Sequence, residues 1–259
     1  MPSWDAHQYL RFAEERTQAC RDLVARIALA RVRSAIDLGC GPGNSTRILA
    51  RRWPDAQVTG LDSSSAMITA ARRARAARRL VEGDIAQWAE GDSERYDLVF
   101  SNAALQWVPR HGALCPRLLA HVARGGALAA QLPARGRSRA HRIERELAAS
   151  PRWRRWFPNG RVPTWHAHNP EFYYDALSPH ARRVDLWETE HIHVMTGAES
   201  IVEWYRGTGL RPYLEAIGEE PERRRFLAEY LAGVRAAYPP RPDGRVLFPF
   251  RRLFMVAYR

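Results

Sequence analysis

The stretch IDLGCGPGNST, residues 36 to 46, decides the fold of this chain. An apolar run that contains Asp37 leads into three glycines at alternate positions, Gly39, Gly41 and Gly43, and then into small polar residues. Glycine lets the backbone turn through positive φ and lets a ligand approach with no Cβ in the way. The pattern predicts a buried strand, a tight loop that holds a ligand, and a helix.

The spacing of the glycines is GxGxG, whereas the dinucleotide-binding fingerprint is GxGxxG. Pro42 also lacks the backbone N–H that a pyrophosphate would use. We therefore expect a ligand held by packing and carbonyl groups, and no binding of NAD.

Two further acids follow predicted strands. Asp62 lies 19 residues after Gly43, where a carboxylate can accept both hydroxyls of a ribose. The alternative is that Asp62 caps the next helix, in competition with the three serines that follow it. Asp84 either meets an adenine amino group or is a turn acid.

The composition limits the classes of protein to which this chain can belong. The 259 residues suit one large domain, or one domain with an insertion. We find no apolar run of about 18 residues and no signal-peptide core, so we expect a cytoplasmic protein with no membrane partner. Three isolated cysteines, Cys20, Cys40 and Cys115, favour neither a disulfide framework nor a zinc site.

The net charge of +12 raises the question of a nucleic-acid partner. All 40 basic residues are arginine, however, and a nucleic-acid surface normally mixes arginine and lysine. A complete absence of lysine is more typical of a GC-rich genome. We therefore expect a solvated, arginine-covered surface and no nucleic-acid partner.

Strands and helices alternate along the first half of the chain after an N-terminal helix over 9–31. Short apolar strands in such an alternation predict an α/β fold with a parallel sheet covered on both faces and a ligand crevice at the carboxyl ends of the strands. The pattern breaks over 134–183, which we expect to be mostly helical. The expected strands are 34–40, 57–62, 79–84, 96–102, 126–132, 184–195 and 252–258, and the expected helices are 45–53, 65–77, 111–123, 199–208 and 221–238.

The motifs IDLGCGPGNST, GLDSS, GDI and FSNAALQWV resemble those of the class I S-adenosylmethionine-dependent methyltransferases. The closer resemblance is to the trans-aconitate methyltransferases, and it runs nearly from end to end. The more specific motifs are WDAHQYLRFAEER at the start, SNAALQWVP, the YYD of 173–175, GTGLRP at 207–212 and PFRRLFMVA at 249–257.

The resemblance implies a Rossmann-like class I methyltransferase fold, with a seven-stranded, mostly parallel sheet, helices on both faces and a helical cover. It implies S-adenosylmethionine as the cofactor. The implied division of the chain is a helical lid (1–30), a cofactor-binding core (31–133), a substrate cover (134–183) and the C-terminal part of the sheet (184–259).

The resemblance also assigns residues to parts of the cofactor site. It places Asp37, Gly39 and Gly41 at the methionine end, Asp62 and Ser63 at the ribose, Asp84 and Ile85 at the adenine, Asn102 and Ala103 near the sulfonium, and Trp4 and Tyr9 in a lid over the site.

The implied reaction is methylation of a carboxylate on a small polycarboxylic acid, most specifically trans-aconitate. A carboxylate with a reference pKa of about 4 is ionised at neutral pH, so no general base and no metal are needed. Alignment of oxygen, methyl and sulfur can then supply about 7–11 kcal/mol. The alternatives are a class I methyltransferase for another small acceptor, a nucleic-acid methyltransferase, and a non-catalytic nucleotide-binding protein.

An anionic acceptor needs cationic and hydroxyl partners. The candidates are Trp107, Arg135, His141, Tyr173, Tyr174 and Arg211. Each has a structural alternative. If the two tyrosines lie in extended backbone, their side chains face opposite ways and one of them packs in the core. His141 could instead be an ordinary surface histidine, and Trp107 could pack against a pocket wall. Arg211 precedes a proline and is therefore expected in extended or turn backbone.

The family pattern is altered after the fifth strand. Where the family usually reads QMPDN and then PTH, this chain has Gln131 to Arg135 as QLPAR and then Arg139-Ala140-His141. This leaves the exact acceptor open. His191 and His193 alternate on a predicted strand without a third ligand, so we expect no metal there, and we expect the protein to be a monomer.

Overall fold

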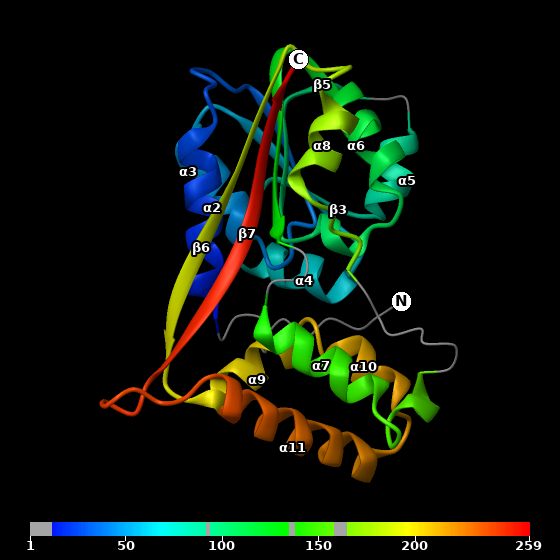
Figure 1. Ribbon diagram of the computed structural model, residues 1–259. Helices are drawn as coiled ribbons and strands as arrows, with labels where there is room; N and C mark the ends of the chain where they lie inside the picture. Colours follow the sequence, from blue (N-terminus) through cyan, green and yellow to red (C-terminus); the bar gives the residue numbers. More distant parts are fainter. Residues whose placement is uncertain (1–11, 92–93, 135–137, 158–164) are drawn as a thin grey trace. The chain divides into compact units, whose positions relative to one another are not determined.

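The computed structural model describes residues 12–91, 94–134, 138–157 and 165–259 (Figure 1). The chain divides into two compact units. Unit 1 comprises the described residues of Met1–Ala134 together with His166–Thr189 and Arg252–Arg259; unit 2 comprises the described residues of Arg135–Trp165 together with Glu190–Arg251.

A seven-stranded sheet organises the chain, in the order β3-β2-β1-β4-β5-β7-β6. The pairs β1–β2, β1–β4, β2–β3 and β4–β5 are parallel, and β7 runs antiparallel to β5. The predicted seven-stranded, mostly parallel sheet is therefore confirmed. The strands are β1 (Ser34–Leu38), β2 (Gln57–Asp62), β3 (Arg79–Glu82), β4 (Tyr96–Asn102), β5 (Val122–Pro133), β6 (Arg183–Met195) and β7 (Val246–Tyr258).

Helices cover both faces of the sheet in unit 1 (Figure 1). α2 and α3 pack on one face, and α5, α6 and α8 pack on the other. The helical elements of unit 1 are α2 (Ala13–Arg26), α3 (Asn44–Arg52), α4 (Ser65–Arg73), α5 (Ile85–Glu90), η1 (Leu105–Trp107), α6 (His111–Ala120) and α8 (Pro170–Leu177).

Burial on both faces explains why the strands read as continuous apolar runs. Within β1, Ala35 belongs to the core beneath α2 and α3, while Ile36 belongs to the core beneath α6. Successive side chains on a strand point to opposite faces, so a parallel strand covered twice must be apolar at every position. The one acid in β1, Asp37, is therefore an exception that needs its own explanation.

Unit 2 has a core built largely from aromatic rings. Trp153 packs edge-on against Phe226, with ring centroids 5.1 Å apart, and its indole N–H donates to Glu229 at 2.7 Å. Phe157 and Tyr213 join the same cluster. The helical elements of unit 2 are α7 (Arg139–Ala149), η2 (Arg154–Trp156), α9 (Ala198–Arg206), α10 (Arg211–Ala216) and α11 (Glu220–Ala237).

The structure adds elements that the sequence did not predict. α5 and α10 are short helices where the sequence predicted no element, and β7 begins at Val246, six residues before the expected strand over 252–258. The expectation that Arg211 is extended or in a turn is wrong. Arg211 is the first residue of α10 and Pro212 the second. Proline is tolerated there because the first amides of a helix have no partner within it.

The described residues of 134–183 include three helical elements, as predicted, but they contribute to both units. α7 and η2 lie in unit 2, whereas α8 packs in unit 1 against α6. In the described part of the chain, none of the helices combines the length and the apolar character needed to span a bilayer.

We expect Gly39→Ala to cost more than positive φ alone explains. A Cβ on Gly39, at φ 72°, would lie 2.2 Å from the Cβ of Ala104, so the loop after β1 or the one after β4 must move. Gly125 has φ 81° and open space around its Cβ position, so Gly125→Ala is the matched control. Strain from the left-handed backbone alone is about 1–2 kcal/mol.

Urea unfolding checks this expectation. Gly39→Ala should lose about 1–3 kcal/mol more than Gly125→Ala, the usual range for overpacking. Equal losses for the two variants would contradict the close approach of the two loops.

Candidate active site

The glycine loop follows β1 at the point where the strand order reverses. β1 lies between β2 and β4, so the chain leaves it in one direction along the sheet and later returns on the other side. In open α/β sheets ligands bind in the crevice at the carboxyl ends of the strands beside such a point. The backbone N–H groups of Gly39 and Cys40 donate to the carbonyl of Leu61 at 2.7 and 3.0 Å, which ties the loop to the end of β2.

Asp62, the last residue of β2, fixes the same loop. Its Oδ2 accepts the amide of Gly41 at 2.9 Å and its Oδ1 accepts the amide of Ser64, also at 2.9 Å. The N-cap of α4 is Ser64, whose hydroxyl accepts the amide of Met67. Asp62 is therefore not the helix cap. An ionised carboxylate has about four acceptor positions, so Asp62 can still accept ligand hydroxyls.

Partial burial raises the pKa of Asp62, against the opposing effect of the amides of Ser64 and Gly41. Hydrogen bonds from two hydroxyls would favour the ionised form further. Ser63, next in the chain, is exposed beside it.

Asp84 is the N-cap of α5. Its Oδ1 accepts the amides of Ala86 and Gln87 at 2.8 and 3.0 Å. Asp84 therefore caps a helix, which agrees with the structural alternative to adenine binding. Ile85 is buried in the core, and its Cδ1 would lie 3.7 Å from a Cβ on Gly39. The start of α5 therefore packs beside the glycine loop.

Asp37 is wholly buried and holds α3 to β1. Its Oδ2 accepts the hydroxyls of Ser45 and Thr46, both at 2.7 Å. Burial raises the pKa of Asp37 to about 6, and the two hydroxyls oppose that effect. This acid sets the position of the helix that follows the glycine loop, which explains its place in an otherwise apolar strand.

The end of β4 meets α2 at a small cavity. Asn102 lines it, and Ala103, at φ 55°, donates its amide to the carbonyl of Gln131 at 2.8 Å. The cavity has a volume of about 20 Å³, about the space of one water molecule. Its lining residues are Arg16, Thr17, Cys20, Gly39, Cys40, Pro42, Asn44, Ser45 and Asn102.

Sequence reasoning missed Arg16, which is only 7% exposed. A signal for it exists in the sequence. Ala19, Cys20 and Leu23 form the buried face of α2, and Arg16 stands one turn earlier on that face. A cation on the apolar face of an amphipathic helix is unusual, and its place beside Gly39 and Asn102 makes Arg16 a candidate for the site.

Two of the predicted acceptor residues in unit 1 have contrasting environments. Tyr173 is wholly buried; its hydroxyl meets Nδ1 of His111 at 2.7 Å and accepts the amide of His168 at 3.2 Å. It therefore has a structural role, as was expected for one tyrosine of the pair. Tyr174 is 51% exposed on α8, and Trp107 is half-buried in η1. The pair is helical and not extended.

Two other predicted acceptor residues lie in unit 2. His141 is largely covered, its side chain 13% exposed, with Trp165 and Tyr205 edge-on to its ring, so the alternative of a surface histidine is wrong. Burial lowers the pKa of His141 to about 3, and its Nε2 lies 3.9 Å from Oε1 of Glu144. The Arg211 side chain is 14% exposed, and its Nε lies 3.7 Å from Glu215.

Trp4, Tyr9 and Arg135 lie outside the described residues. His191 and His193 stack on β6, with ring centroids 6.1 Å apart. Within the described ranges, no three histidine, cysteine or acidic side chains are grouped as metal ligands.

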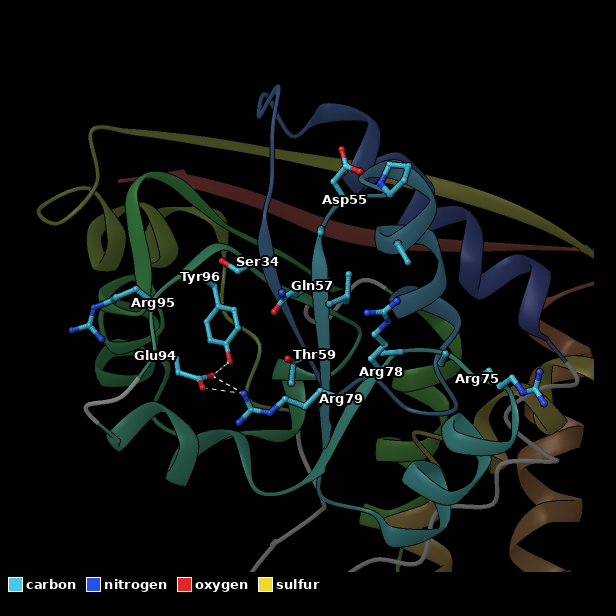
Figure 2. A pocket seen from close by; sticks show the side chains of 16 residues that line it. Ser34, Asp55, Gln57, Thr59, Arg75, Arg78, Arg79, Glu94, Arg95 and Tyr96 are labelled. Carbon is cyan, nitrogen blue, oxygen red and sulfur yellow. Dashed lines mark hydrogen bonds and ion pairs between the residues drawn. The ribbon is translucent and has the colours of Figure 1, made fainter.

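A separate hollow of about 960 Å³ lies at the amino ends of the strands, where Ser34, Gln57 and Tyr96 begin β1, β2 and β4 (Figure 2). Glu94 accepts hydrogen bonds from Tyr96 and from Arg79 there. These charged side chains are more than half exposed, and ligands of parallel sheets bind at the opposite end. The hollow is therefore not a candidate active site.

Comparisons with known proteins identify the class to which the chain belongs. Residues 35–126 match the methyltransferase domain family. The fold is also that of Haemonchus contortus phosphoethanolamine N-methyltransferase 2, at 16% identity and a TM-score of 0.55 over 93% of this chain and 52% of that one. The YcgJ protein of Bacillus subtilis aligns over 93% of this chain and 98% of its own, with a TM-score of 0.60 at 11% identity. The chain is a class I methyltransferase.

Full-length relatives define the family more narrowly. A trans-aconitate 2-methyltransferase of Azoarcus sp. strain BH72 is 50% identical over 261 residues, which cover 100% of both chains. Proteins of the same name from Rhodopseudomonas palustris strain BisB18 and Methylobacterium nodulans are 45% and 43% identical, covering 100% of this chain and 100% and 99% of theirs. The chain belongs to the trans-aconitate 2-methyltransferase family.

The burial of Asp37 predicts a pH dependence of stability. Its folded pKa of about 6 exceeds the reference value of 3.8, so the folded chain holds this proton to higher pH than the unfolded chain does. Stability is therefore lost as the pH rises from about 4 to about 6. The difference between the two pKa values is about 2, which corresponds to about 3 kcal/mol at most.

Asp37→Asn should remove this loss, because the amide oxygen can still accept the hydroxyls of α3 and carries no charge. The free energy of unfolding of the variant, relative to the native chain, should rise by up to about 3 kcal/mol between pH 4.5 and pH 7.5. Thr46→Val is a useful companion, since it removes a hydrogen bond that lowers the pKa of Asp37. A relative stability that does not change with pH would contradict the assignment.

Proposed function

We propose that this chain transfers the methyl group of S-adenosylmethionine to a carboxylate of a small polycarboxylic acid, with trans-aconitate as the acceptor and a monomethyl ester as the product. One observation carries the proposal: 50% identity over the whole length with a protein named trans-aconitate 2-methyltransferase. The class of fold and the glycine loop agree with it. That the chain acts as a cytoplasmic monomer stays a prediction.

The residues at the loop suit the cofactor. Among the described residues, a Cβ on Gly41 would meet nothing within 4 Å, so this part of the structure leaves space for a ligand above the loop. Asp62 can accept ribose hydroxyls while it holds Gly41 and Ser64. Asp84 and Ile85 form the start of α5 beside the loop, a position suited to the adenine.

Arg16 and Asn102 suit the methionine end. The cofactor carries a carboxylate there, and these two side chains line the small cavity beside Gly39. A guanidinium pairs with a carboxylate through two parallel hydrogen bonds, which fixes its orientation as well as its charge. We assign Arg16 to this carboxylate, in addition to the glycine loop.

The chemistry requires little of the protein besides position. The bound cofactor supplies a methyl group already activated on a positively charged sulfur. The carboxylate of the acceptor is ionised at neutral pH, so the protein holds it in line with the methyl and excludes water, and no side chain needs to take up a proton. Cation and anion lose charge together, so a dry site favours the reaction.

The cofactor assignment predicts selective losses of affinity. Asp62→Ala and Arg16→Met should each weaken the binding of S-adenosylmethionine by about 1.5–3 kcal/mol in calorimetry, the range for a hydrogen bond to a charged group. Asp97→Ala is the matched control. Asp97 also accepts two backbone amides, those of Arg33 and Ser34, but at the amino end of β1. It should lose stability and keep its affinity; unchanged affinity in Asp62→Ala would remove Asp62 from the site.

The reaction itself is tested with a labelled methyl group. The protein should methylate trans-aconitate in the presence of EDTA, and mild base should release the label, because an ester is cleaved and an ether or N-methyl group is not. A panel of di- and tricarboxylic acids and other small acceptors completes the test. A base-stable product, or a better acceptor without carboxylates, would favour the alternative of a methyltransferase for another metabolite.

A further inference from the structure

Ala103, directly after β4, occupies an unusual backbone conformation. Its φ of 55° lies in the left-handed region, which is unfavourable for a residue with a Cβ. Three non-glycine residues of the described ranges have positive φ, and two of them, Ala103 and Arg110, bracket the loop between β4 and α6. Strained residues persist only where the surrounding structure holds them, and they gather at ligand sites. The strain at Ala103 therefore points to a function for this loop.

Gln106 holds this conformation from within the same loop. Its side-chain Nε2 donates to the carbonyl of Ala103 at 2.7 Å, while the amide of Ala103 donates to the carbonyl of Gln131 at 2.8 Å. Gln106 is 4% exposed, so water cannot readily take the place of its side chain. Loss of a buried donor leaves its acceptor without a partner, which costs the full desolvation of that acceptor. Both polar groups of the strained residue are thus fixed by the protein, one of them by a side chain.

The Gln106 side chain is itself set in a well-anchored turn. His111, buried at the start of α6, meets the carbonyl of Leu105 with its Nε2 at 2.9 Å and the hydroxyl of Tyr173 with its Nδ1 at 2.7 Å. A carbonyl can only accept, so the proton is on Nε2, and Nδ1 accepts from the tyrosine. The carbonyl of Gln106 also accepts the amide of His166 at 2.9 Å. η1 is therefore tied to α6 and to the segment before α8, and it presents Gln106 at a fixed position.

The turn at Ala103 sets the direction of the residues on either side of it. Ala104 lies so close to the glycine loop that its Cβ would be 2.2 Å from a Cβ on Gly39. Asn102 lines the small cavity beside Gly39, and its amide oxygen is buried without a hydrogen-bond partner among the described residues. A buried, unpaired acceptor is rare and suggests a donor that arrives with a ligand. The left-handed turn thus connects the loop after β4 to the proposed site of the methionine end.

We propose that Gln106 is a positioning residue of the cofactor site. Its side-chain amide stabilises the left-handed turn at Ala103, and the turn directs Asn102 towards the ligand and Ala104 against the glycine loop. The inference rests on the proposed function, since it concerns the site assigned to S-adenosylmethionine. It gives a role to the glutamine of the NAALQW motif at 102–107, which acts through Ala103 and does not itself touch the ligand.

Replacement of Gln106 should weaken the binding of one part of the cofactor. Gln106→Met keeps the length of the side chain and removes the donor, so that Ala103 can leave the left-handed region and misdirect Asn102. Calorimetric affinity for S-adenosylmethionine should fall by between about 5-fold and about 30-fold, as expected for strain of this kind. Affinity for 5′-methylthioadenosine, which lacks the amino-acid part, should stay within about 2-fold of the native value. Gln106→Asn, whose amide is one methylene too short to reach the carbonyl, should give the same result and serves if Gln106→Met does not fold.

Ala103→Gly should suppress the effect of Gln106→Met. Glycine adopts positive φ about as readily as negative φ, so the turn then depends less on the glutamine. In the Ala103→Gly background, Gln106→Met should therefore weaken S-adenosylmethionine binding by about 2-fold or less. A general loss of packing around Gln106 would not be rescued by this change.

Tyr258→Phe is the matched control for lost stability. The hydroxyl of Tyr258 accepts the amide of Ala28 at 2.9 Å, so this variant also removes a bond between a side chain and the backbone. Tyr258 is in register with Ala127, four residues before Gln131 on β5 and away from the crevice. The control should unfold more easily in urea and keep the native affinity for both ligands.

Native binding of S-adenosylmethionine tests the proposed function, and the variants test the inference. If the native chain does not bind the cofactor, both fall. If it does, three results would overturn the inference and leave the proposed function standing, because Gln106 would then only stabilise the fold. These are an unchanged affinity in Gln106→Met, an equal loss for both ligands, and a loss that persists in full in the Ala103→Gly background.

Discussion

The hydrogen bonds between the glycine loop and the end of β2 are the constraint on which the active site depends. The amides of Gly39 and Cys40 share the carbonyl of Leu61, and the amide of Gly41 reaches Asp62. The end of β2 therefore sets the path of the loop, and its Asp62 carboxylate keeps acceptor positions that the described part of the protein does not use. The loop fits because Gly39 lacks a Cβ, which would collide with Ala104. If these hydrogen bonds were lost, the loop after β1 would move, and so would the loop after β4 that packs against Gly39.

Asp37 fixes the helix that follows the same loop. It is buried at a raised pKa, and it accepts the hydroxyls of Ser45 and Thr46 in the first turn of α3. The arrangement costs stability near neutral pH and fixes the start of a helix that no side-chain N-cap holds, since the N-cap is Gly43. A buried carboxyl group with a raised pKa is typical of a functional site. The loop is thus held on one side by β2 and on the other by β1.

Polar side chains beside the glycine loop distinguish this end of the sheet from the apolar core. Arg16 and Asn102 line the small cavity next to Gly39. In the proposed cofactor site they suit the carboxylate of the cofactor. The net charge of +12 is a poor guide to function, because most arginines decorate the surface, whereas Arg16 is buried.

The sequence by itself determined the α/β class, the parallel sheet, the glycine loop and the family, because these depend on local patterns: apolar strands, glycine spacing and motifs at fixed offsets. It also pointed to Asp62, which the structure shows holding the glycine loop. It did not point to Arg16, because that side chain reaches the glycine loop only through the packing of α2. It offered Asp84 as a binding residue or a turn acid, and the fold gave it the cap of α5. It placed Tyr173 among the acceptor residues, whereas packing against His111 made it part of the core. Burial and hydrogen-bond partners are properties of the tertiary structure, and they decide which of several chemically suitable side chains is available to a ligand.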